Sequence, residues 1–120
     1  FRRTIYRFSP RGARRNLLDT FDCPDSSALA PNRATTTTPL QSLALMNNRF
    51  VLSQSDFFAK RLTEDAVKDI KAQLTLAHEL ALGRPAAPKE LALAEAFIAD
   101  HGLAAYCRVL FNTNAFLYVR

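Results

Sequence analysis

The sequence contains little glycine and no long apolar run. Only three of its 120 residues are glycine, so it has no Gly-rich loop that could cradle a phosphate and no Gly-x-Ser-x-Gly turn for a nucleophilic serine. Arg, Lys, Asp or Asn interrupts each hydrophobic stretch, whereas a membrane-spanning helix needs about 20 consecutive apolar residues. The sequence therefore predicts a chain without a membrane span.

Cysteine and histidine, the common ligands of transition metals, are also scarce. Cys23 and Cys107 belong to no Cys-x-x-Cys spacing, and His78-Glu79 lacks the second histidine of a metalloprotease helix. We therefore expect no metal and no cofactor in this chain, and we interpret His78 and His101 as ordinary helix residues. The cysteines could pair in an oxidising compartment, but packing as two small buried side chains is the favoured alternative.

The formal net charge of +5 comes from one segment. Six arginines and no acid lie within residues 1–15, which leaves ten basic residues against eleven acidic ones in the remainder. A basic arm of this kind can bind nucleic acid through phosphate contacts. Arginine pairs equally well with carboxylates elsewhere in a larger protein, and this structural interpretation is the one we favour. The arginines are Arg2, Arg3, Arg7, Arg11, Arg14 and Arg15.

Helix signals dominate the rest of the chain. Thr38-Pro39 followed by Gln41 has the form of an N-cap, a proline in the first turn and a capping-box glutamine. This pattern predicts a helix from Pro39 to about Leu62, with a weak point at Asn47-Asn48. A second helix is expected from about Glu64, with Val67 on its apolar face, to Gly83.

A third helix is expected from Pro88 to His101-Gly102, and a fourth from Leu103 to about Asn112. The apolar tail 116–119 should pack or pair. Residues 1–38 are rich in turn-forming Pro and Gly pairs, with one brief helix near Leu17. The predicted fold class is all-α: a small pack of about four helices (39–120) preceded by a turn-rich, partly helical basic arm (1–38).

Several phrases, in order along the chain, carry a resemblance. Phe21-Asp22-Cys23-Pro24-Asp25, Asn32-Arg33, and the run from Thr36 to Asn47 resemble the hallmark stretch of a planctomycete-type C-terminal domain of unknown function. Ala81-Leu82-Gly83-Arg84-Pro85 with Glu90-Leu91 is similar to that family's helix-turn-helix signature, and Leu110-Phe111-Asn112 with Phe116-Leu117-Tyr118 to its terminal motif. The resemblance covers almost all of the chain.

The resemblance implies a parent protein of a particular kind. In that family the domain ends large exported bacterial proteins that also carry a planctomycete cytochrome-c-like domain, so haem would belong to an upstream domain. Because the sequence begins at Phe1, we expect it to be the C-terminal part of one larger domain, with the upstream domains of the same polypeptide as its partners. The resemblance carries no established activity.

The polar residues of the hallmark stretch form a candidate pocket, which comprises Asp22, Asp25, Arg33, Thr36, Gln41 and Asn47. Two carboxylates could serve as acid and base or hold a hard cation. Helix capping and turn formation explain most of these residues as well. We therefore expect a non-catalytic structural or interaction module. The alternatives are an active site of the full-length protein acting on extracellular polymer, and nucleic-acid binding through the arginine-rich arm.

Overall fold

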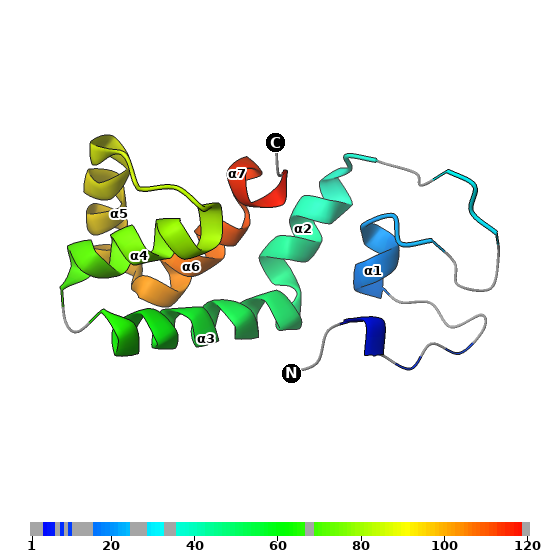
Figure 1. The fold of residues 1–120 in the computed structure, drawn as a ribbon, viewed down its shortest axis with the longest axis horizontal. Coiled ribbons are helices and arrows are strands. Elements are labelled where there is room, and N and C mark those ends of the chain that lie inside the picture. Colours follow the sequence, from blue (N-terminus) through cyan, green and yellow to red (C-terminus); the bar gives the residue numbers. More distant parts are fainter. Residues whose placement is uncertain are drawn as a thin grey trace. The chain divides into compact units, whose positions relative to one another are not determined.

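The computed structural model describes residues 4–6, 8, 10, 16–24, 29–32, 36–66 and 69–118. Within these ranges the ordered structure is helical and contains no strand, which confirms the predicted all-α class (Figure 1). The elements are a 3-10 turn Thr4–Tyr6, α1 Asn16–Thr20, α2 Pro39–Asn47, α3 Arg49–Asp65, α4 Ile70–Leu82, α5 Pro88–His101, α6 Leu103–Phe111 and α7 Asn114–Leu117.

The chain divides into two compact units, Phe1–Ala44 and Leu45–Arg120. The predicted division into residues 1–38 and 39–120 stays a prediction. In the first unit, the predicted brief helix is present as α1, which supports the description of this segment as partly helical. The six arginines of the predicted basic arm lie outside the described residues.

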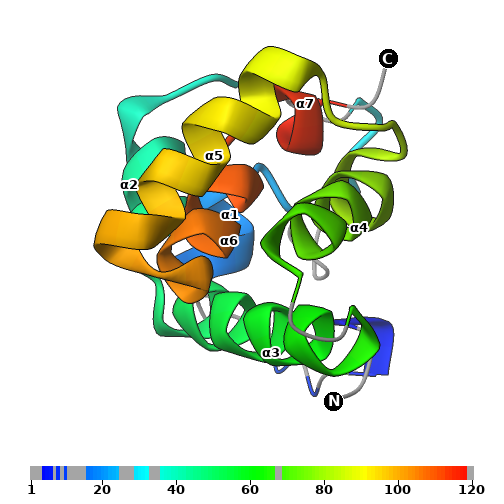
Figure 2. The same cartoon turned by 90° about the vertical axis from the view of Figure 1, so that its left-hand side faces the viewer.

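In the second unit, α6 is the central helix and contacts α3, α4, α5 and α7. Figure 2 shows α5 above it and α3 below it. Arg108 is the one charged residue between Leu103 and Phe111, and the buried side of α6 carries Tyr106, Cys107 and Leu110. Leu62 of α3, Leu74 of α4 and Cys107 of α6 are fully buried in one cluster.

Small residues let these helices approach closely. Ala59 of α3, Ala77 of α4 and Ala94 of α5 belong to the same buried cluster, where a larger side chain would push the helices apart. At the edge of the cluster the ring of Phe111 stacks on Phe58, with centroids 5.4 Å apart, and contacts Phe116 of α7 at 4.9 Å. The predicted packing of the apolar tail is thus confirmed at Phe116.

The helix ends follow local chemistry. Asn48 separates α2 from α3, and its side-chain Oδ1 accepts a hydrogen bond of 2.9 Å from the Phe50 N–H, so the predicted weak point is a true break. Gly83 ends α4 with a left-handed φ of 66°, a conformation that costs glycine little. Pro88 begins α5 as predicted.

The predicted start of the next helix near Glu64 is wrong. Glu64 and Asp65 instead end α3, where they pair with Lys60 at 3.8 Å and Arg61 at 3.2 Å, one turn earlier. The start of α4 is Ile70, and the carboxylate of Asp69 caps it by accepting from the Lys71 N–H at 3.1 Å. Val67 of the predicted face lies outside the described residues. No helix in the described part of the chain is long and apolar enough to span a membrane.

Candidate functional site

Asp22 and Thr36, two residues of the predicted pocket, are joined directly. Asp22 follows α1 and has a left-handed φ of 55°, a conformation that Asp tolerates better than most residues. Its Oδ2 accepts from the Thr36 N–H at 2.6 Å, and the Thr36 hydroxyl lies 2.9 Å from both carboxylate oxygens. The turn after α1 therefore holds the segment that leads into α2.

Gln41 of α2 connects to the same contact. Its Nε2 donates to the Thr36 carbonyl at 3.0 Å and to the Thr36 hydroxyl at 3.3 Å, while its Oε1 accepts from the Thr38 N–H at 3.3 Å. The last bond is the predicted capping-box interaction. Gln41 is the one buried residue among the described residues of the first unit. Asp22, Thr36 and Gln41 thus form a hydrogen-bonded cluster, called here the hallmark cluster.

Three predicted pocket residues remain. Asp25 and Arg33 lie outside the described residues. Asn47 ends α2 and belongs to the second compact unit. In the hallmark cluster the carboxylate of Asp22 is occupied by Thr36, so the visible role of these residues is to position the start of α2. A ligand-binding or catalytic role of the six residues stays a prediction.

A second polar cluster, which the sequence indicated only as a helix-turn-helix signature, surrounds Glu90 at the start of α5. Arg84 holds its carboxylate through two bonds, Nη2 to Oε1 at 2.6 Å and Nη1 to Oε2 at 2.8 Å. The Ala87 N–H donates to Oε2 at 2.8 Å. The Arg84 guanidinium, followed by the Ala87 N–H, lowers the pKa of Glu90 to about 2, and the same pairing raises the pKa of Arg84.

His78 of α4 and Tyr106 of α6 lie beside this carboxylate. The His78 ring is almost completely buried, and its Nδ1 lies 3.0 Å from the Leu74 carbonyl, which can only accept a hydrogen bond. Its Nε2 is 4.0 Å from Glu90 Oε2. Burial, and then the Glu90 charge, raise the pKa of Tyr106 to about 12.

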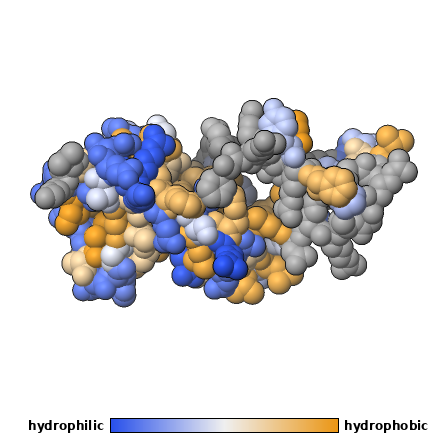
Figure 3. Space-filling model, turned by 90° about the horizontal axis from the view of Figure 1, so that it is seen from below, coloured by the Kyte–Doolittle hydropathy of each residue, from blue (hydrophilic) through white to orange (hydrophobic). Residues whose placement is uncertain are grey.

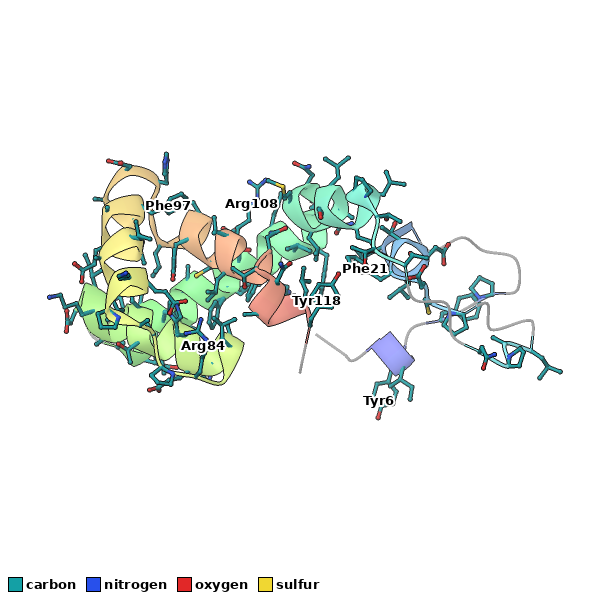
Figure 4. All side chains as sticks on the ribbon, turned by 90° about the horizontal axis from the view of Figure 1, so that it is seen from above. Tyr6, Phe21, Arg84, Phe97, Arg108 and Tyr118 are labelled. Carbon is teal, nitrogen blue, oxygen red and sulfur yellow. The ribbon has the colours of Figure 1, made fainter. Side chains whose placement is uncertain are left out.

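We call this second cluster the Glu90 cluster. Its members are His78 of α4, Glu90 of α5, Tyr106 of α6 and Arg84 of the turn between α4 and α5. Figure 4 labels Arg84 at that turn. The sequence signal that could have indicated it is the Arg84 to Glu90 spacing across Pro85 and Pro88. His78, interpreted from the sequence as an ordinary helix residue, is a buried polar side chain of α4 that lies near the Glu90 carboxylate.

Neither cluster forms a metal site within the described ranges, where no group of three or more His, Cys, Asp or Glu residues could hold an ion. Both cysteines are free, Cys23 half-buried and Cys107 fully buried. Burial raises the pKa of the Cys107 thiol to about 12, so this side chain packs as a small hydrophobe rather than as a nucleophile.

Comparison with known proteins adds one finding. The model of the PSD1 family, described as a protein of unknown function (DUF1553), matches residues 1–98. The chain belongs to this family. The matched region contains the whole hallmark cluster and the Arg84, Glu90 and His78 side chains of the Glu90 cluster. No curated protein and no solved structure matches the chain.

Proposed function

We propose that this DUF1553 chain is a non-catalytic structural or interaction module whose first unit packs against upstream domains of the same polypeptide. One observation carries the proposal: the first unit exposes several of its large apolar side chains. Those that support the proposal are between 68% and 101% exposed, and they are Ile5, Tyr6, Phe8, Leu29 and Leu40.

The two units differ in the burial of their apolar side chains. Every buried hydrophobic residue described lies in the second unit, whereas Gln41 is the one buried residue described in the first. Burying a side chain such as Leu29 or Phe8 stabilises a protein by roughly 1.5–3 kcal/mol relative to leaving it in water. A segment with several such groups gains from a partner surface. Hydrophobic surface also reaches solvent beside hydrophilic patches in the view of Figure 3.

The proposed context is a larger exported bacterial protein. This context includes a cytochrome-c-like domain upstream. It is supported by the resemblance of the hallmark stretch to the planctomycete-type C-terminal domain. In this proposal haem is held by that upstream domain, and the present chain contributes buried apolar contacts rather than ligands to iron.

Hydroxyl-radical footprinting tests the proposal by comparing the 120-residue chain with its full-length parent. We expect the labelling of Tyr6, Phe8 and Leu29 to fall several-fold in the parent, because a partner covers them. Tyr118, which is half exposed in the second unit, is the matched control for Tyr6 and should keep its labelling. Equal labelling of Tyr6, Phe8 and Leu29 in the two proteins would contradict the proposal.

A second candidate function is supported by the convergence of Asp22, Thr36 and Gln41. The hallmark cluster would then contribute to an active site of the full-length protein, acting on extracellular polymer. Asp22→Asn keeps the size of the side chain and removes its charge. Loss of polymer hydrolysis with unchanged circular dichroism would support this candidate, and unchanged hydrolysis would eliminate it. Binding of nucleic acid rests on the arginine-rich sequence alone and is not proposed.

A further inference from the structure

A cavity of about 410 Å³ lies in the second unit, lined by residues of α4, α5, α6 and the segment that leads into α7. Its walls are mostly apolar and include Leu93 and Phe97 of α5 and Val109 and Leu110 of α6. Leu93 is 73% exposed, so the cavity is open to solvent on that side. Figure 4 shows Phe97 on α5. His78 and Tyr106, which carry polar groups, also line it. An apolar cavity of this size with a few convergent polar groups is typical of a site for a small organic molecule.

His78 offers this cavity a hydrogen-bond acceptor. Because Nδ1 bonds to the Leu74 carbonyl at 3.0 Å, Nδ1 carries a hydrogen, and in the neutral imidazole Nε2 is then the accepting nitrogen. The contact from Nε2 to Glu90 Oε2, at 4.0 Å, is too long for a hydrogen bond. Nε2 can therefore receive a donor from a molecule in the cavity.

The two charged residues that line the cavity, Arg84 and Glu90, neutralise each other. The Glu90 carboxylate, which also lines the cavity, is neutralised by the two bonds from Arg84, and its Oε2 accepts a further bond from the Ala87 N–H. An anionic ligand would meet the Glu90 charge, and a cationic ligand would meet Arg84. Both would lose hydration without gaining a free counter-charge.

Tyr106 supplies the complementary group. Its ring lies 6.3 Å from the His78 ring, centroid to centroid, and a tyrosine phenol is protonated at neutral pH. A protonated phenol can donate one hydrogen bond. The cavity thus combines one acceptor and one donor, which is the pair that a hydroxyl group satisfies.

We propose that this cavity binds a small neutral phenol or aryl alcohol. Its apolar body lies against Phe97, Leu93 and Val109, and its hydroxyl donates to His78 Nε2 and accepts from Tyr106. This inference is independent of the proposed docking of the first unit, because each residue that it uses lies in the second unit.

Titration calorimetry of the 120-residue chain with three probes tests the chemistry of the site at mildly alkaline pH. The probes are 4-ethylphenol, its methyl ether 4-ethylanisole, which cannot donate, and the anion 4-ethylbenzoate. One net hydrogen bond corresponds to roughly a 2- to 12-fold change in affinity, so we expect 4-ethylphenol to bind about 5-fold more tightly than either comparator. Equal affinity for the phenol and the ether, or no detectable binding, would overturn the proposal.

Variants locate the site and assign the hydrogen bonds. His78→Leu should abolish the preference for the phenol over the ether, and Tyr106→Phe, which removes only the hydroxyl, should weaken phenol binding about 5-fold. Tyr106→Phe keeps the test decisive if the buried His78→Leu variant does not fold. Leu93→Ala should weaken binding, whereas Leu80→Ala, an exposed leucine of α4 outside this lining, should not. Phenol binding unchanged in Tyr106→Phe would exclude this site.

Discussion

Replacing Glu90 by Gln tests how much the start of α5 contributes to stability through charge. The substitution keeps an oxygen for the Ala87 N–H and removes the negative charge that Arg84 holds. A pKa lowered from 4.5 to about 2 corresponds to at most about 3 kcal/mol of stabilisation at neutral pH. Because the Glu90 side chain is 37% exposed, solvent screening reduces this figure, and we expect a loss of about 1–2 kcal/mol.

The loss must depend on pH in one direction. The folded protein binds the Glu90 proton less readily than the unfolded chain, so the contribution is complete above the ordinary pKa of 4.5 and disappears as pH falls through about 2. The difference between wild type and Glu90→Gln should therefore be constant from neutral pH to about pH 5. By about pH 3 it should shrink to less than half.

Urea unfolding followed by circular dichroism, repeated across this pH range, measures the difference. Glu95→Gln is the matched control, because Glu95 is on the same helix with the same 37% exposure but meets Lys71 only at 4.0 Å. Its effect should stay within about 0.5 kcal/mol at every pH. A Glu90→Gln protein as stable as wild type at neutral pH, or a difference that does not diminish in acid, would refute the reasoning.

Three further changes should be measurable in the same protein. Leu62→Ala removes a fully buried side chain and should cost about 2–5 kcal/mol in urea unfolding, whereas the exposed Leu80→Ala should cost far less. In Gly83→Ala the added methyl group meets no neighbouring atom, but alanine must adopt a φ of 66°. We therefore expect the free energy of unfolding to fall by about 1 kcal/mol, seen as a lower melting temperature. In thiol titration with Ellman's reagent, Cys23 should react well before the buried Cys107. Equal reaction rates of the two thiols would contradict the burial of Cys107.

Helix ends that depend on local chemistry could be predicted from the sequence. The break between α2 and α3 follows from the short polar side chain of Asn48, which bonds to a backbone group two residues on. The end of α4 follows from Gly83, and the start of α5 from Pro88. In each case one residue's own backbone or side chain decides the outcome, so no knowledge of distant contacts is needed.

The start of α4 could not be predicted from a single local residue. Acidic residues favour the first turn of a helix. Four residues after a base they can also pair with that base on the preceding helix, although in the last turn this position opposes the helix dipole. Glu64 and Asp65 satisfy both patterns. The structure selects the second: α3 continues to Asp65, where the Ala66 N–H bonds to the Leu62 carbonyl, and Asp69 caps α4.

The two polar clusters also differ in how far local sequence patterns could predict them. The hallmark stretch indicated Asp22, Thr36 and Gln41 together, although only the structure shows that Thr36 links the other two. The Glu90 cluster depends on how three helices pack. No local pattern relates His78 to Tyr106, which are brought to the same cavity by the burial of their helices' apolar faces.

The contact between Asp22 and Thr36 has a consequence for length variation. It joins residues 14 positions apart, so the ends of the intervening segment are fixed independently of what lies between them. Doubling the length of a flexible loop adds only about 0.6 kcal/mol to its closure entropy. Insertions between these two residues, whether in natural relatives or as an engineered epitope tag, are therefore compatible with an unchanged start of α2.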